Sequence, residues 1–103
     1  MTITSKQKQY LRALAHPLKP VVQVGTKGIP EALLRQVSEQ LETHELIKVR
    51  FNTESAVEPS SAADELATKT SSYLVQKTGR TLTLYRRREK NPKIELPKPP
   101  TRK

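Results

Sequence analysis

The sequence of 103 residues contains no cysteine, no tryptophan and one phenylalanine, and aromatic residues make up 4% of the chain. The absence of cysteine excludes disulfide bonds and thiolate metal sites, and it favours a reducing compartment. With so few aromatic residues the core must be small and aliphatic. A core of this kind argues against a roomy enclosed active site.

Long apolar runs are also missing from the sequence. No stretch approaches the roughly 20 apolar residues that a helix needs to cross a membrane. The first residues, Met1 to Lys6, lack the apolar run of a secretory signal peptide. We therefore expect a soluble, cytoplasmic protein without a membrane partner, and the length predicts one domain that acts as a monomer.

Acidic side chains are scarce relative to basic ones. Lysine and arginine number 19 against 10 acids, which gives a net charge of +9 and a pI of about 10.1. Such an excess favours a polyanionic partner, of which nucleic acid is the leading candidate. Residues 1–85 hold 11 basic and 8 acidic side chains (+3), whereas residues 86–103 hold 8 and 2 (+6). We divide the chain into a binding domain, residues 1–86, and a basic, proline-rich tail, residues 87–103, predicted to be disordered.

Hydrophobic periodicity predicts seven elements. A helix capped by Ser5 begins near Lys6 and ends at His16-Pro17, and the β-branched run 21–24 predicts a short strand. A second helix begins at Pro30, and residues 46–51 alternate as a strand with Ile47, Val49 and Phe51 on one face. A third helix from Ser60 or Ser61 to about Thr70 precedes a hairpin of strands 73–77 and 81–85. The order α-β-α-β-α-β-β predicts an α/β fold with a four-stranded mixed sheet and packed helices.

The segment Gly25-Thr26-Lys27-Gly28 is the first candidate binding element. Two glycines let the backbone approach a ligand, the following helix presents unpaired N–H groups, and Lys27 adds a cation. A phosphate group is the ligand that this combination suits. The alternative interpretation is an ordinary strand-to-helix turn with a solvated lysine, because short glycine motifs recur by chance.

Further basic residues extend this candidate site. Lys48 and Arg50 lie on the same side of their predicted strand, Arg80 projects from the hairpin turn, and Lys19 precedes the first strand. Together they predict a basic surface that spans sheet and loop, although scattered solubilising charges would give the same pattern. Base stacking has only Tyr10, Tyr73 and Tyr85 to use, so recognition is expected to rely on phosphate, sugar and shape.

Catalytic and metal-binding patterns are not found in the sequence. His16 and His44 are far apart and outside any ligand-spaced cluster, which favours capping or packing roles over metal binding. The acids do not combine with a candidate nucleophile, and no serine stands in a nucleophile elbow. We therefore expect no enzymatic activity, no metal and no cofactor.

Two motifs in the sequence are familiar in combination. Residues 14–28, LAHPLKPVVQVGTKG, followed by residues 44–49, HELIKV, closely resemble the CRM domain, named for chloroplast RNA splicing and ribosome maturation. The resemblance covers about residues 4–86, and the length suggests the bacterial single-domain YhbY group. It implies a fold similar to the C-terminal domain of translation initiation factor three, with a GxxG loop, like that of KH domains, at Gly25 to Gly28. Thr26 stands where the family commonly has a second basic or polar residue.

The resemblance implies a role for the protein as well. Members of this family bind RNA, and the bacterial ones associate with precursors of the large ribosomal subunit, so ribosomal RNA is the expected partner. An adaptor that contacts a ribosomal or assembly protein mainly through its tail is the alternative hypothesis. General DNA binding is a third hypothesis, which the lack of a helix dense in Arg, Asn or Gln disfavours.

Overall fold

The computed structural model describes residues 3–26, 28–55 and 57–96. Its elements follow the order predicted from the sequence. They are α1 (Ser5–Ala15), β1 (Val22–Val24), α2 (Glu31–His44), β2 (Leu46–Phe51), α3 (Pro59–Lys69), β3 (Tyr73–Thr78) and β4 (Thr81–Tyr85). The four strands form one mixed sheet, so the predicted α/β architecture is confirmed.

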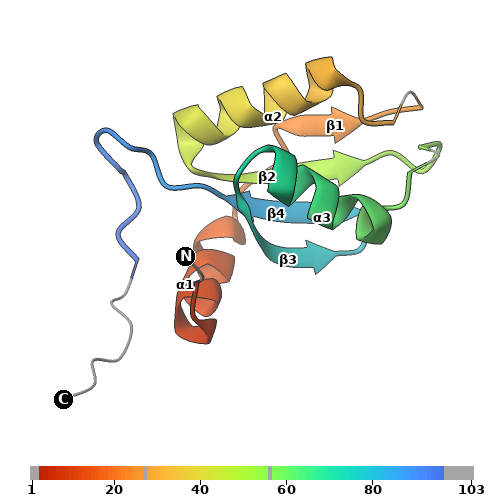
Figure 1. Ribbon diagram of the computed structural model, residues 1–103. Coiled ribbons are helices and arrows are strands. Elements are labelled where there is room, and N and C mark those ends of the chain that lie inside the picture. Colours follow the sequence, from red (N-terminus) through yellow and green to blue (C-terminus); the bar gives the residue numbers. More distant parts are fainter. Residues whose placement is uncertain (1–2, 27, 56, 97–103) are drawn as a thin grey trace.

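The sheet has the strand order β1-β2-β4-β3 (Figure 1). The short edge strand β1 pairs with β2 in parallel, and the hairpin of β3 and β4 adds to β2 in antiparallel orientation. The register places Gln23 beside Arg50 and Thr81 beside Arg50 on the other side. Because paired residues point to the same face of a sheet, these three side chains share one face.

Helices α2 and α3 cover one face of the sheet and α1 covers part of the other (Figure 1). The larger core lies under α2 and α3. As predicted, it takes the alternate residues Ile47, Val49 and Phe51 of β2. The helices contribute small and aliphatic side chains, namely Leu33, Val37, Leu41, Ala62, Ala63 and Leu66. The core is aliphatic apart from Phe51, in agreement with the composition.

A second, smaller core lies on the opposite face beneath α1. It contains Leu11, Ala15, Leu46, Val75 and Tyr85. Leu46 is only 4% exposed, so the face of β2 that carries Lys48 and Arg50 begins with a buried leucine. Helix α1 therefore leaves open only the part of this face that lies toward the carboxyl end of β2.

Several predicted element ends differ from the structure by one or two residues. Helix α3 begins at Pro59 instead of Ser60 or Ser61, and β3 runs to Thr78 instead of residue 77. Thr4, rather than Ser5, caps α1, because its hydroxyl accepts the Gln7 N–H while the Gln7 side chain accepts the Thr4 N–H. Pro30 occupies the N-cap position of α2 and lies just outside the helix. Val21 lies outside β1, although its N–H donates to the Lys48 carbonyl.

The prediction of a disordered tail is wrong for the part of it that the structure describes. Residues 88–96 form no helix or strand, but they pack against the domain through Ile94 and Leu96. The Glu45 carboxylate, which is fully buried, accepts the backbone N–H groups of Arg88, Lys93 and Ile94 at 2.8, 2.6 and 2.8 Å. Residues 97–103 lie outside the described residues.

Arg86 fixes the start of this segment. Its guanidinium donates to the Ser38 carbonyl and hydroxyl and to the Thr70 carbonyl, and it lies 3.3 Å from the Glu42 carboxylate. It therefore ties the end of β4 to both α2 and α3. The amino-acid composition does not predict this packing, because a segment rich in lysine and proline has few apolar residues. The acceptor of its N–H groups, the Glu45 carboxylate, also lies far away in the sequence.

Candidate nucleic-acid interface

Three connections meet at the carboxyl end of β1 and β2, at the right of Figure 1. They are the glycine loop Gly25–Gly28, the loop between β2 and α3, and the turn of the β3–β4 hairpin. The Asn52 N–H donates to the Val24 carbonyl at 2.9 Å, and the Phe51 N–H donates to the Arg80 carbonyl at 2.7 Å. These bonds hold the three connections together as one end of the molecule.

The two glycines of the loop have different roles. Gly28 has a φ of 76° and is buried, so its conformation favours glycine, and a Cβ there would lie 3.2 Å from Val57 Cγ2, which is a tight contact. At Gly25 a Cβ would meet only the Asn52 side chain, at 4.0 Å. Gly25 therefore leaves room for a ligand to approach the backbone, whereas Gly28 shapes the turn.

Thr26 is exposed at the loop, and Lys27 lies outside the described residues. The loop leads directly into α2, whose N-terminus has no side-chain cap. The first N–H groups of a helix have no intrahelical acceptor and carry the positive end of the dipole, which suits an anion. Glu31 stands in the first turn and partly offsets this field. The loop is thus suited to one phosphate, with cations needed nearby.

The nearest described cation on the open sheet face is Arg50. It is exposed, and it pairs in register with Gln23, two residues before Gly25. Lys48 lies two positions back along β2 on the same face and is half-buried, with its ammonium 3.5 Å from the His16 carbonyl. Lys19 follows in the connection between α1 and β1 and is exposed. These three side chains form a basic track, here defined as Lys19, Lys48 and Arg50.

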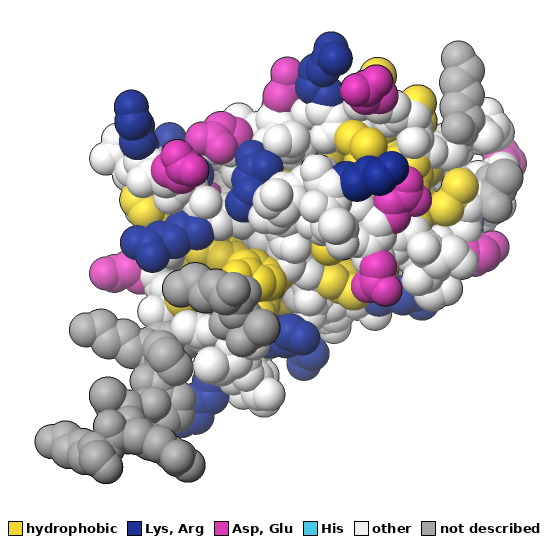
Figure 2. Space-filling model, viewed as in Figure 1, with side chains coloured by type: hydrophobic (Ala, Val, Ile, Leu, Met, Phe, Trp, Pro, Cys, Tyr) yellow, Lys and Arg dark blue, Asp and Glu magenta, His cyan; other side chains and the backbone are white. Residues whose placement is uncertain are grey.

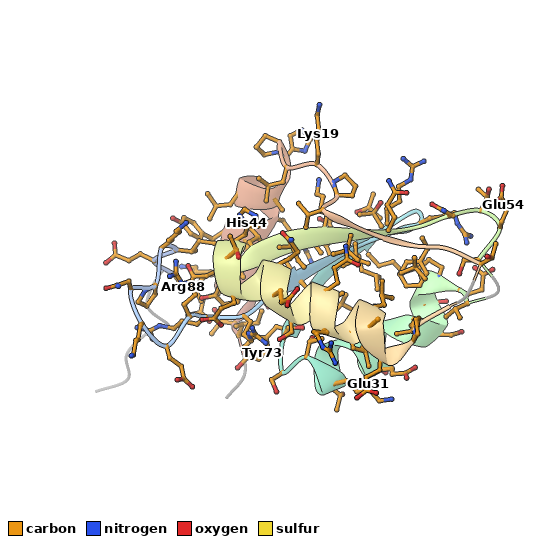
Figure 3. The ribbon with its side chains drawn as sticks, turned by 90° about the horizontal axis from the view of Figure 1, so that it is seen from above. Lys19, Glu31, His44, Glu54, Tyr73 and Arg88 are labelled. Carbon is orange, nitrogen blue, oxygen red and sulfur yellow. The ribbon has the colours of Figure 1, made fainter. Side chains whose placement is uncertain are left out.

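The basic track and α2 lie on opposite sides of the sheet. Figure 3 shows Lys19 on one side and Glu31 on the other, with Glu54 at the far end of the β2–α3 loop. Across the face covered by α2 and α3, basic and acidic side chains are interspersed (Figure 2). The loop end and the open face of β2 are therefore better candidates for contact with a polyanion than the helical face.

Arg80 does not project freely from the hairpin turn. Its Nε donates to the Phe51 carbonyl at 3.1 Å and its Nη2 to the Asn52 carbonyl at 2.8 Å, while Nη1 lies 3.6 Å from the Glu58 carboxylate. The structure thus gives Arg80 a positioning role at the loop end. It brings Arg80, Arg50 and the glycine loop to one end, and leaves Lys19 and Lys48 toward the other.

The three tyrosines offered as stacking platforms differ in access. Tyr85 is 2% exposed and belongs to the smaller core, so it is not available to a base. Burial, with a further effect of the Glu45 carboxylate, raises the pKa of the Tyr85 hydroxyl. Tyr73 is half-buried, and Tyr10 is exposed on α1. The described surface therefore offers no row of aromatic rings on which bases could stack.

Neither a metal site nor a membrane-spanning helix is found among the described residues. They contain no group of three or more histidine or acidic side chains placed to hold a metal ion. None of the helices in residues 3–26, 28–55 and 57–96 has the length and apolarity of a membrane span. His16 stands at the C-cap of α1 and His44 in the last turn of α2. Sequence reasoning missed the buried Glu45, because nothing in the pattern HELIKV distinguishes a buried carboxylate from a surface one.

The fold and these surfaces define a small α/β protein whose candidate site is a glycine loop at a helix N-terminus and a basic sheet face. The family model of the CRS1/YhbY (CRM) domain matches residues 3–86. The chain therefore belongs to the CRS1/YhbY (CRM) domain family, and the resemblance seen in the sequence is confirmed.

Relatives match over nearly the whole chain. "Probable RNA-binding protein YqeI" of Bacillus subtilis is 40% identical over 95 residues, which cover 92% of this chain and 99% of that protein. An "RNA-binding protein" of Haemophilus influenzae is 38% identical over 97 residues, 94% of this chain and 97% of that one. The solution structure of SAV1595 from Staphylococcus aureus is 40% identical and superposes with a TM-score of 0.71, covering 93% of this chain and all of that chain.

Proposed function

We propose that this chain is a non-catalytic RNA-binding protein that acts in the cytoplasm on precursors of the large ribosomal subunit. The observation that carries the proposal is the glycine loop Gly25–Gly28, which leads into the uncapped N-terminus of α2. The loop lies at the same end as the exposed Arg50, in a chain with a net charge of +9. Relatives named as RNA-binding proteins support RNA as the partner.

In this proposal the loop holds one RNA phosphate and the basic track guides the strand across the sheet face. A phosphate oxygen accepts N–H groups at the start of α2, and Lys27 supplies the cation. Arg50, Lys48 and Lys19 contact further phosphates. Because the described surface lacks a row of aromatic rings, affinity comes from charge and shape, and ribosomal RNA supplies both in folded form.

The alternative adaptor function placed the main protein contact on the tail. The described tail residues are already engaged with the domain, since Arg88, Lys93 and Ile94 donate to Glu45. This engagement disfavours the described part of the tail as the segment that folds on a protein partner.

A loop double variant tests the proposal. Thr26→Asp with Lys27→Asp removes one cation and adds two negative charges while both glycines, and hence the turn, remain. Loss of a charge-assisted contact costs roughly 1.5–3 kcal/mol, so affinity for a ribosomal RNA fragment is expected to fall about tenfold to a hundredfold.

The matched control is Thr68→Asp with Lys69→Asp, which makes the same two substitutions on exposed positions at the end of α3. It changes the net charge equally and should weaken binding only through the general field. Circular dichroism verifies that both variants fold. Equal affinities of the two variants would show that the loop is only a turn.

Sedimentation tests the proposed target separately. The full chain is expected to migrate with precursors of the large subunit in a sucrose gradient, and the loop double variant to remain at the top. Migration with finished ribosomes alone would contradict a role in assembly while leaving RNA binding intact.

A further inference from the structure

Exposed apolar side chains gather on one part of the described surface, away from the glycine loop. Among the described residues four large apolar side chains are exposed, each by about two fifths: Tyr10, Leu14, Leu18 and Val21. All four belong to α1 or to the connection between α1 and β1. Exposed apolar side chains scattered singly need no explanation, but a contiguous group of them marks an interaction surface.

Three of these side chains, Leu14, Leu18 and Val21, line one groove with a volume of about 450 Å³. Leu46 and Ile47, which are nearly fully buried, form its floor, and Ile94 of the C-terminal segment closes one side. Tyr10 stands one helical turn before Leu14 and extends the apolar surface along α1. We call this the apolar groove, lined by Leu14, Leu18, Lys19, Val21, His44, Leu46, Ile47 and Ile94.

The eight residues that line the apolar groove include one lysine, Lys19, and no acid. The Glu45 carboxylate, which contacts Ile94, is fully buried and already accepts three backbone N–H groups. Lys93 stands beside the groove, with its ammonium 3.5 Å from the Thr43 carbonyl. Figure 3 shows Lys19 on the side of the sheet away from Glu31, and His44 at the end of α2 that is distant from Glu31 and Glu54. A ligand of the apolar groove therefore needs apolar groups for the floor and negative charge for the rim.

Two other occupants fit these features less well. The last residues of the chain, Pro97 to Lys103, include Lys98, Arg102 and Lys103 and no acid, so their charge opposes that of the rim. An RNA nucleotide would match the charge through its phosphate, but unpaired bases bind by stacking on aromatic rings and by hydrogen bonding at their edges. The lining offers one ring, that of His44, and besides Lys19 its other six side chains are aliphatic.

We propose that the apolar groove binds a short acidic segment of a partner protein. Two apolar side chains of that segment occupy the space between Leu14, Leu18 and Val21, and its carboxylates face Lys93, while Lys19 remains on the basic track. The glycine loop lies at the opposite end of β1, so RNA and the partner segment bind at the same time. The protein then joins an RNA site to an acidic protein through a groove that the domain and the packed segment around Ile94 form together.

A random peptide library displayed on phage tests this proposal without assuming a partner. Selection on the full chain, with Leu18→Ser/Val21→Ser as the counter-selecting variant, is expected to enrich 12-residue peptides that carry net negative charge and at least two of Leu, Ile, Phe or Met. Both substituted side chains are about two fifths exposed, so the variant should fold. No enrichment over the variant, or enrichment of basic peptides, overturns the proposal.

The strongest selected peptide is then synthesised and titrated into the labelled full chain. We expect its amide shifts to be confined to residues around Leu14, Leu18, Val21 and Ile94, and its Kd to rise at least tenfold in Leu18→Ser/Val21→Ser. A peptide with lysine in place of each acid should bind at least tenfold more weakly. Shifts at the groove caused by oligouridylate in preference to the peptide would assign the groove to RNA and overturn the proposal.

The RNA site and the groove can be tested independently of each other. The loop double variant Thr26→Asp/Lys27→Asp should keep the peptide Kd within twofold, and the groove double variant should keep RNA affinity within twofold. A groove variant that loses RNA binding and peptide binding together would place both ligands on one surface, which contradicts the groove as a separate protein site.

Discussion

The carboxylate of Glu45 accepts the backbone N–H of Ile94 at 2.8 Å, which joins the end of α2 to a residue 49 positions further along the chain. Glu45 has a φ of 65°, a backbone conformation that residues other than glycine rarely adopt, and its side chain is fully buried. Its two oxygens also accept the N–H groups of Lys93 and Arg88. The strained backbone directs a charged acceptor inward, where it orders a segment without secondary structure.

Replacement of Glu45 should therefore destabilise the protein. Glu45→Gln keeps the shape of the side chain but removes its charge, so the bonds to three N–H groups weaken and one amide NH2 faces donors. We expect the free energy of unfolding to fall by about 2 kcal/mol and Tm by roughly 10 °C, measured by thermal denaturation. Glu54→Gln, on the exposed β2–α3 loop, is the control and should leave Tm unchanged. Equal Tm values would show that the Glu45 bonds contribute nothing to stability.

Two truncations should separate the packed segment from the residues after it. Ending the chain after Arg86 removes the three donors of Glu45 and the apolar contacts of Ile94 and Leu96, leaving a buried carboxylate without those partners. We expect a loss of about 3 kcal/mol or more, with exposure of the smaller core. Ending it after Leu96 should leave Tm nearly unchanged and weaken RNA binding through the lost charge alone. Similar Tm values for the two truncated chains would show that residues 87–96 contribute nothing to stability.

Tyr85 should make stability depend on pH in the alkaline range. Burial and the Glu45 carboxylate raise its pKa above the ordinary value of 10.0, so the folded protein holds this proton more tightly than the unfolded chain. The contribution is fully present below about pH 10 and is lost as pH rises through the folded-state pKa. We expect unfolding free energy to fall more steeply above pH 10 in the parent than in Tyr85→Phe. Below pH 9 Tyr85→Phe should be at least as stable as the parent, because the Tyr85 hydroxyl is buried without a hydrogen-bond partner in the described structure.

The basic track and Arg80 should respond differently to neutralisation. Lys48→Gln and Arg50→Gln are expected to lower the slope of log affinity against log salt by about 0.7–0.9 each, with Tm unchanged, since each removes one phosphate contact. Arg80→Gln should lower Tm instead, because the Arg80 guanidinium donates to two backbone carbonyls at the loop end. Arg35→Gln, on the exposed face of α2, is the control for the salt slope. An unchanged slope in the track variants would move the RNA contacts to another surface.

The sequence by itself determined the elements and their order. Apolar periodicity located α2 and β2, and Gly28 and Gly79 marked two of the turns that take positive φ. Alternation along β2 also placed Phe51 in the core and Arg50 on the open face, because a strand allows only two faces. The two motifs identified the family because they are local patterns of sequence, which can be recognised without knowledge of the fold.

Only the tertiary structure decided which charged side chains already bond to other parts of the protein. Arg80 and Arg86 resemble the other arginines in the sequence, yet Arg80 ties two loops together and Arg86 joins two helices to β4. The burial of Glu45 and the packing of Ile94 depend on contacts across more than 40 residues, which no local pattern encodes. The apolar groove likewise forms from three separate stretches of the chain, around residues 14–21, 44–47 and 94. Whether a side chain is a ligand contact or a structural tie depends on its neighbours in space, and those neighbours are set by the packing of the whole domain.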